Sequence, residues 1–138
     1  MELNKKITSN IPFSLHDSRI MRMEITNDYL TLFLDEVYEY KNNSEKYYPA
    51  NITFNDIDYE ECNILVFNKG VVNGRFSGVR YEIKEYINKF ADTEFEILTE
   101  SYGTYSTVLE GLVWRDGNDP VSGIINIWNT GDVVFKFE

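Results

Sequence analysis

The sequence has few of the residues that most often carry covalent or metal chemistry, with one cysteine and one histidine among 138 residues. The lone Cys62 can form neither an intrachain disulfide nor a cysteine-rich zinc site. The lone His16 excludes the metal phosphohydrolases that are built on several histidines. We therefore expect no metal and no cofactor.

Long apolar runs are also missing. The first ten residues lack the apolar core of a signal peptide, and no apolar run approaches the length of a membrane span. Together with the unpaired cysteine, this predicts a soluble, cytoplasmic protein that does not enter a membrane. The abundance of Asn, Lys, Ile and Tyr is typical of a bacterial source with an AT-rich genome.

Basic residues are scarce, because 13 Lys and Arg are outnumbered by 23 Asp and Glu, for a formal net charge of −10. An acidic surface repels phosphate groups, which argues against nucleic acids and anionic membranes as partners. It attracts a basic protein or a cation. The alternative is that the negative charge only keeps the domain soluble.

Aromatic residues, in contrast, are abundant, at 15% of the chain. Tyr and Phe favour half-buried pleated surfaces, so the composition predicts a β-rich fold. Residues 18–26 and 29–36 both have the alternating polarity of half-buried strands. Asn27 and Asp28, between them, tolerate the positive φ that a tight hairpin turn usually requires. The apolar positions of this predicted hairpin are Met21, Met23, Ile25, Leu30, Leu32 and Leu34.

Other strands follow from the same kind of pattern. We expect positive φ at Gly131, in the turn of a second hairpin. The region 70–78 is interrupted by three glycines and predicts a flexible connection, in which only Val71-Val72 suggests a short strand. The further strands are predicted at 50–55, 59–67, 94–102, 105–114, 123–128 and 133–137.

The period changes over residues 79–90, where apolar side chains recur at three- and four-residue steps. One such helix needs a sheet to cover, and Ser77 is the nearest candidate for its N-cap. We therefore predict an α+β fold, mainly antiparallel β, with a curved sheet or barrel-like sandwich and one amphipathic helix at about 79–90. No repeat or linker divides the chain, so we expect a single domain over residues 1–138.

His16 and Asp17 form the first candidate site. Asp17 could orient His16 as a base, since histidine titrates near neutral pH. Neighbouring residues of an extended chain point to opposite faces, however, so the alternative is a structural turn in which Asp17 caps and His16 packs against the sheet. For Cys62, the adjacent Glu60 and Glu61 disfavour a reactive thiolate.

Carboxylates cluster at Asp56, Asp58 and Glu60. On a strand these side chains would share a face and could hold a hard cation. The alternative is a solvated acidic edge, which discourages aggregation between sheets.

A second candidate site consists of four tyrosines in a polar, acidic segment, Tyr38, Tyr40, Tyr47 and Tyr48. Tyr and Trp are enriched where proteins bind one another. Trp114, beside a loop, and Trp128, before the last turn, are further candidate anchors. The alternative is that these rings cover sheet edges. The predicted binding residues are His16, Asp17, Arg19, Tyr38, Tyr40, Tyr47, Tyr48 and Trp114.

The segment Phe13–Ile20, FSLHDSRI, is followed by an alternating hairpin. It resembles small uncharacterised bacterial β-rich domains in which an HD-[SAC]-x-[IV] motif leads into the first strand. Some of these resemble immunity proteins of polymorphic toxin systems, where a small acidic domain caps a toxin. The resemblance covers about 25 residues and implies a shared structural position for His16 and Asp17, with no catalytic residue.

No catalytic set assembles along the chain. We therefore expect a non-enzymatic soluble binding protein, immunity-like, that docks a basic protein. The alternative is a small hydrolase or ligand-binding enzyme centred on His16, which requires a pocket where His16 meets at least two carboxylates. A third alternative is a structural partner in a homo-oligomer.

Overall fold

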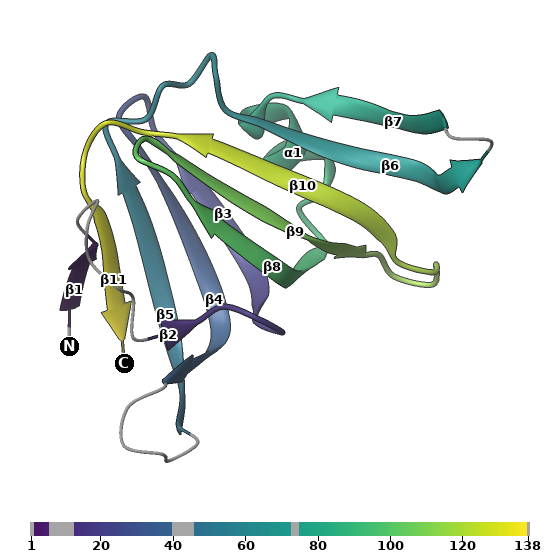
Figure 1. The fold of residues 1–138 in the computed structure, drawn as a ribbon. Helices are drawn as coiled ribbons and strands as arrows, with labels where there is room; N and C mark the ends of the chain where they lie inside the picture. Colours follow the sequence, from purple (N-terminus) through teal and green to yellow (C-terminus); the bar gives the residue numbers. More distant parts are fainter. Residues whose placement is uncertain (1, 6–12, 40–45, 73–74, 138) are drawn as a thin grey trace.

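Antiparallel strands make up most of the protein, and a short helix packs on them (Figure 1). The computed structural model describes residues 2–5, 13–39, 46–72 and 75–137. The strands are β1 Glu2–Lys5, β2 Phe13–Ser14, β3 Arg19–Ile25, β4 Tyr29–Glu39, β5 Lys46–Asn55, β6 Asn63–Val72, β7 Arg75–Tyr81, β8 Glu94–Tyr102, β9 Ser106–Trp114, β10 Val121–Trp128 and β11 Val133–Phe137, and the helix is α1, Ile83–Lys89.

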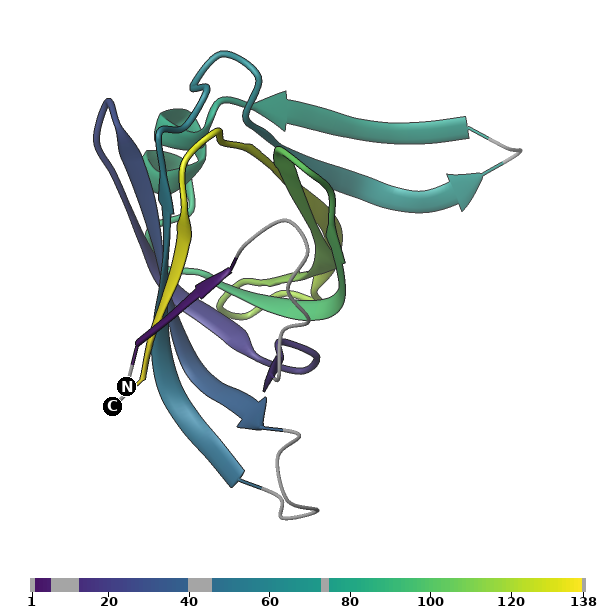
Figure 2. The same ribbon diagram turned by 60° about the vertical axis from the view of Figure 1, so that its left-hand side comes forward.

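The strands form one sheet in the order β1-β11-β5-β4-β3-β8-β9-β10-β6-β7, with β2 paired to β4. The sheet is not closed, but it curls so that β11, β5 and β4 face β8, β9 and β10 (Figure 2). The predicted α+β fold with a curved, mainly antiparallel sheet is confirmed. Within the described ranges, no helix has the length and apolarity needed to cross a membrane.

The inner face of the curled sheet carries the core. Leu30, Leu32 and Leu34 on β4 are all buried, as their alternation predicted. Their neighbours across the curl come from every long strand, because alternate side chains of each strand point inward. The large side chains with the least exposure are Phe54, Phe95, Phe135, Leu15, Leu30, Leu32, Ile52, Ile64, Ile83, Ile97, Leu109 and Ile125.

The first hairpin is confirmed, but β3 does not keep one alternation along its length. The register between β3 and β4 shifts between Ile20 and Arg22. This irregularity buries Ile20 and leaves Met21 exposed, although the alternating pattern placed Met21 on the apolar face. Met23 and Ile25, beyond the shift, are half-buried against the core.

The predicted helix is present but starts four residues later than the pattern indicated, at Ile83. Val79 shares the helical spacing, yet it lies on β7 and is exposed. Ser77 is not the cap. Instead Glu82 and Glu85 form a capping box, in which each side chain accepts a hydrogen bond from the other residue's backbone N–H.

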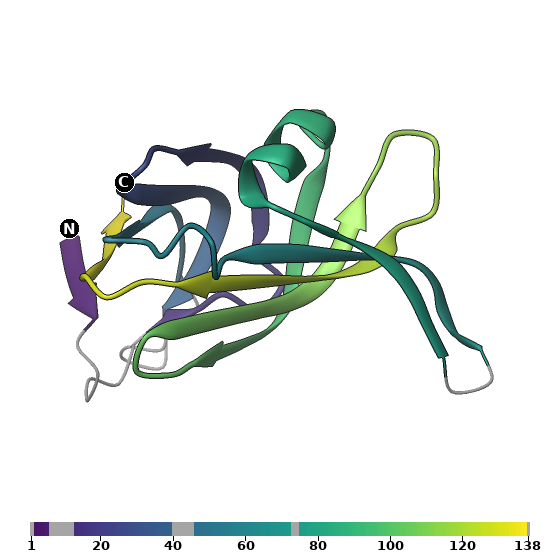
Figure 3. The same cartoon turned by 90° about the horizontal axis from the view of Figure 1, so that it is seen from above.

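The expected flexible connection is also wrong. Residues 63–72 and 75–81 form β6 and β7, which pair antiparallel and extend away from the rest of the sheet (Figures 2 and 3). Gly78 lies within β7, and glycine is required there because β6 and β7 approach closely. A Cβ at this position would come 2.6 Å from the Val66 carbonyl oxygen.

The sheet is narrowest between β3 and β8. Only Arg19–Glu96 and Ile20–Phe95 are paired there, whereas most neighbouring long strands share longer registers. Two more backbone hydrogen bonds, Asp17 N–H to Ile97 O at 2.7 Å and Ile97 N–H to Ser18 O at 2.8 Å, extend the contact. The segment before β3 therefore joins the two halves of the sheet.

Candidate binding site

The turn that contains His16 is fastened to β8 by side chains as well as by backbone. The Leu15 N–H donates to Glu100 Oε2 at 2.6 Å, and the His16 backbone N–H donates to Ser14 Oγ at 3.1 Å. Asp17 takes the left-handed conformation with φ of 66°, which a short polar residue tolerates. Most polar contacts of this turn therefore hold the chain in place.

The His16 ring is exposed instead of packed against the end of the sheet. Its Nδ1 lies 2.6 Å from the Leu98 carbonyl oxygen, which can only accept, so Nδ1 carries a proton. Its Nε2 lies 3.5 Å from Asp17 Oδ2. Asp17 is thus beside the ring, at a distance longer than a hydrogen bond.

The hydrolase alternative requires a pocket where the His16 ring meets at least two carboxylates. In the part of the chain that the structure describes, one carboxylate, that of Asp17, lies within ion-pair distance of the ring. Four pockets among the described residues have linings that do not include His16. Nor do the described His, Cys, Asp and Glu side chains form a group of three that could hold a metal ion.

Glu100 is the carboxylate most affected by its surroundings in this region. Partial burial raises its pKa, while the Leu15 N–H and the nearby His16 act in the opposite direction. Because one of its oxygens accepts the Leu15 N–H, the group holds the turn in place.

Arg19 and Trp114 are brought together at the narrow junction of the sheet. The Arg19 guanidinium lies 3.2 Å from Glu94, 4.0 Å from Glu96 and 4.8 Å from the Trp114 ring centroid. The Trp114 indole N–H donates to Glu96 at 2.9 Å. These polar groups satisfy one another, so the cluster acts first as a clamp between β3, β8 and β9.

The predicted tyrosines of the described residues lie on the paired ends of β4 and β5, where β2 places Ser14, two residues before His16, opposite Tyr38. Tyr38 and Tyr47 have ring centroids 5.4 Å apart, and Tyr48 contacts Phe137 edge-on at 6.3 Å. Tyr47 is exposed, whereas Tyr48 is half-buried. Tyr40 lies outside the described residues. Tyr38 therefore lies near the His16 turn, whereas Arg19 and Trp114 lie at the junction of β3, β8 and β9.

Cys62 is buried at the start of β6. Burial raises the pKa of its thiol, the backbone contact with Trp128 opposes this, and Asp58 and Glu61 add to the increase. Its sulfur contacts the backbone of Trp128, which donates to Sγ at 3.2 Å. The prediction of a thiol disfavoured as thiolate is thus supported, although burial is the main cause.

A different surface emerges where four turns meet, at the upper left of Figure 1. The Ile57 N–H donates to Asp28 O at 3.1 Å and the Thr130 N–H donates to Asp56 O at 3.0 Å, which link the β3–β4, β5–β6 and β10–β11 turns. The Asn129 N–H donates to Tyr105 O at 3.0 Å and adds the β8–β9 turn.

This surface is acidic. Residues 56–62 form a loop instead of the strand start that the sequence predicted, so the carboxylates at 56, 58 and 60 do not share a strand face. Within the described residues, no ion pair reaches any of the exposed carboxylates here. We call this surface the acidic end and define it by Asp28, Asp56, Asp58, Glu60, Glu61 and Asp132.

Exposed aromatic rings border the acidic end. Tyr29, Tyr105 and Trp128 expose 40%, 51% and 43% of their surface. The Asp58 N–H donates to Trp128 O at 2.8 Å, so the backbone of Trp128 lies against the acidic loop. Lys84 lies at the margin, with its Nζ 5.4 Å from the Tyr59 ring centroid.

Side chains and close packing hold the turns at Asn27-Asp28 and Gly131, where we expected positive φ and the structure has none. Thr26 Oγ1 accepts the N–H groups of Asp28 and Tyr29 at 3.2 and 3.1 Å, which stabilises the first turn. Gly131 does not have positive φ. It is required because a Cβ would come 2.8 Å from Asn55 O and would also contact the Asp56 carboxylate.

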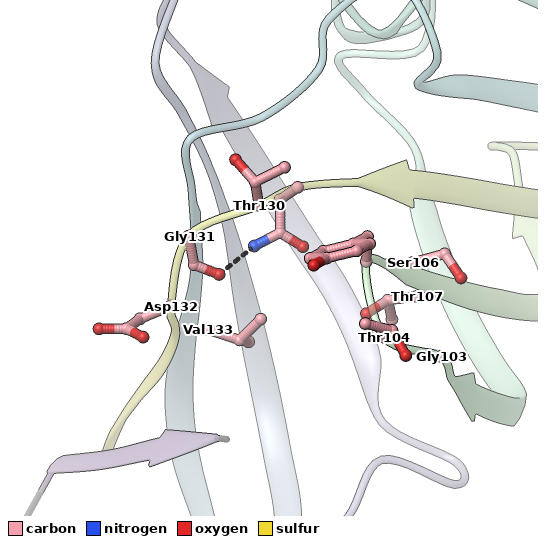
Figure 4. A pocket seen from close by; sticks show the side chains of 10 residues that line it. Gly103, Thr104, Ser106, Thr107, Thr130, Gly131, Asp132 and Val133 are labelled. Atoms are coloured by element: carbon pink, nitrogen blue, oxygen red, sulfur yellow. Dashed lines mark hydrogen bonds between the residues drawn. The ribbon is translucent and has the colours of Figure 1, made fainter. Parts of the chain in front are cut away.

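A pocket of about 280 Å³ opens between the β8–β9 and β10–β11 turns, beside the acidic end (Figure 4). Asn129 and Thr107 line it and are both almost fully buried. Its other lining residues are Gly103, Thr104, Tyr105, Ser106, Thr130, Gly131, Asp132 and Val133.

Most of this surface could not be found from the sequence pattern. The sequence marks Asp56 and Asp58 as clustered carboxylates and Trp128 as a candidate anchor. Only the sheet topology brings these residues together with Asp28 and Tyr105. The one available signal is that polar turns flank the predicted hairpins. No family model, curated protein or solved structure matches the chain.

Proposed function

We propose that this protein is a non-enzymatic binding protein that docks a basic protein through the acidic end. The observation that carries the proposal is the set of six exposed carboxylates without ion pairs among the described residues, bordered by three exposed aromatic rings. Charge of one sign steers an oppositely charged partner, and aromatic rings supply the contact area of binding hot spots.

The backbone of this surface is suited to docking because it is held in place before a partner arrives. Its four turns are connected by hydrogen bonds between main-chain groups, among them Ile57 to Asp28 and Thr130 to Asp56. A preorganised surface loses less conformational entropy on binding.

The finer form of the proposal is an immunity-like role in the bacterial cytoplasm, in which the basic partner is a toxin. It draws on the net charge of −10 and on the resemblance of Phe13–Ile20 to the HD-containing domains. An inhibitor of this kind acts by occupying a surface and needs no catalytic residue of its own.

The test begins with capture of a partner from native extract at low ionic strength, followed by purification of that partner. Binary affinity is then measured for the wild type and for a triple variant, Asp28→Asn, Asp56→Asn and Asp58→Asn. Asparagine keeps the shape of each side chain and tolerates the φ of 52° at Asp56. We expect binding to weaken about tenfold or more, mainly through slower association, and to fall with added salt.

The control is a triple variant of exposed carboxylates elsewhere, Asp92→Asn, Glu110→Gln and Asp116→Asn. It removes the same charge and should change the affinity by about twofold at most. Equal losses in the two triple variants would mean that net charge, and not the acidic end, attracts the partner.

The immunity-like role is tested separately in cells. Expression of the captured partner alone should arrest growth, and co-expression of the wild type should restore it. The Asp28, Asp56 and Asp58 triple variant should restore growth poorly. A partner that is harmless on its own would contradict the immunity-like role.

A further inference from the structure

The pocket beside the acidic end has walls that offer hydrogen-bond acceptors. The Asn129 Nδ2 donates to Asn55 O at 3.1 Å and to Gly131 O at 2.9 Å, so both amide protons are used. Its Oδ1 remains as an acceptor with no partner among the described residues. Because Asn129 is only 5% exposed, this oxygen has little access to solvent except through the pocket.

Thr107 gives the pocket a second oxygen that can accept a hydrogen bond. The residue is 2% exposed and lines the same pocket, and its hydroxyl has no hydrogen bond within the described part of the chain. Neither this oxygen nor Asn129 Oδ1 is among the fully buried side-chain atoms without a partner, so both open onto the pocket, where a ligand with N–H donors can reach them.

Charge and shape narrow the class of ligand. Among the described residues, no Lys or Arg lines the pocket. Asp132 belongs to its wall, although Figure 4 shows the carboxylate turned away from Thr107 and Val133. The other carboxylates of the acidic end add to the negative potential. At about 280 Å³, the pocket is at the small end for a separate ligand but suits one long side chain.

Tyr105 adds an aromatic surface at the mouth of the pocket, where half of its area is exposed. A guanidinium group stacks on such a ring and has several N–H donors for acceptors around its edge. We infer that this pocket receives an arginine side chain of the basic partner. The inference rests on the proposed function, because it names one contact of the same docking surface.

The test uses N-acetyl-arginine amide as the probe and follows the backbone amide resonances of the protein. Resonances of residues 103–107 and 129–133 should shift, with a dissociation constant on the order of millimolar, as expected for a single side chain. N-acetyl-citrulline amide has nearly the same shape without the charge. Its affinity should be lower than that of the arginine probe by a factor of about five or more.

Two variants check the contacts. Tyr105→Ala should weaken arginine amide binding about two- to fivefold, and Thr107→Val, which keeps the side-chain shape, about two- to tenfold. Tyr47→Ala removes an exposed ring at a distance from the pocket and should leave the affinity unchanged. Asn129 is left intact because three of its hydrogen bonds hold the turns together.

The outcomes separate this inference from the proposed function. Absence of localised shifts, or equal binding of the arginine and citrulline probes, would overturn the arginine pocket. The proposed function would stand if the basic partner still binds and still depends on Asp28, Asp56 and Asp58. Loss of that dependence with intact arginine binding would instead contradict the docking role and leave the pocket assigned.

Discussion

The Leu15–Ile20 segment contains side chains that could take part in catalysis or binding, but their contacts hold the fold together. The His16 Nδ1 contacts the Leu98 carbonyl, and Glu100 accepts the Leu15 N–H. Arg19 meets two carboxylates and the Trp114 ring. Each of these groups is paired across the same junction, so the segment with the only histidine is foremost a connection between β3 and β8.

Glu100 provides a test of this view through pH. Its raised pKa means that the folded state holds the proton more tightly than the unfolded chain, so its ionisation lowers stability as the pH rises from the ordinary value of 4.5. Glu100→Gln keeps an acceptor for Leu15 and cannot ionise. Relative to wild type, this variant should gain unfolding free energy between acidic and neutral pH.

The measurement is urea unfolding at both pH values, with Glu110→Gln, an exposed carboxylate on β9, as the control. The difference between wild type and Glu110→Gln should change less over the same range. A Glu100→Gln difference that is independent of pH would contradict the assignment.

Cys62 provides a second test at this scale. Burial and the raised pKa of its thiol predict slow reaction with a thiol reagent in the folded protein, by a factor of about 100 or more relative to the denatured chain. The labelling rate with and without denaturant measures this. Equally fast labelling in both states would show that the β5–β6 loop opens readily.

At the scale of elements, the weak point is the two-pair contact between β3 and β8. Arg19→Met keeps the aliphatic stem but removes the guanidinium that contacts Glu94 and Trp114. We expect a loss of about 1 kcal/mol in unfolding free energy, because both interactions are partly exposed. Amide hydrogen exchange should accelerate most at Ile97, whose N–H donates to Ser18.

Arg22→Met is a close control. Arg22 also pairs with a carboxylate, Glu24, and lies 3.9 Å from the Phe33 ring centroid, but it is not at the junction. It should leave exchange at Ile97 unchanged. If both variants accelerate exchange there to the same extent, the clamp is not specific to Arg19.

The sequence predicted elements best where the polarity alternates without interruption. Residues 94–102 and 133–137 form β8 and β11 with the predicted bounds. The prediction failed at 70–82, because Val79 falls at helical spacing from Ile83 by coincidence and because a glycine such as Gly78 usually marks a break. The close approach to Val66 that requires this glycine is a tertiary contact and leaves no local pattern.

At the scale of the whole molecule, the sheet topology assembles the acidic end. Asp28 and Asp132 are far apart in the sequence, but the sheet order brings β4, β5 and β11 together and places their turns at one end. The charge of this surface is visible in the sequence, whereas its position is not. The predicted residues His16, Tyr47 and Trp114 lie on other parts of the sheet.

The most direct measurement is amide hydrogen exchange of the protein alone and in complex with its purified basic partner. We predict that protection on binding concentrates in residues 27–29, 56–61, 103–107 and 128–132. Protection confined instead to the His16 turn, the Tyr47 region or Trp114 would contradict docking through the acidic end.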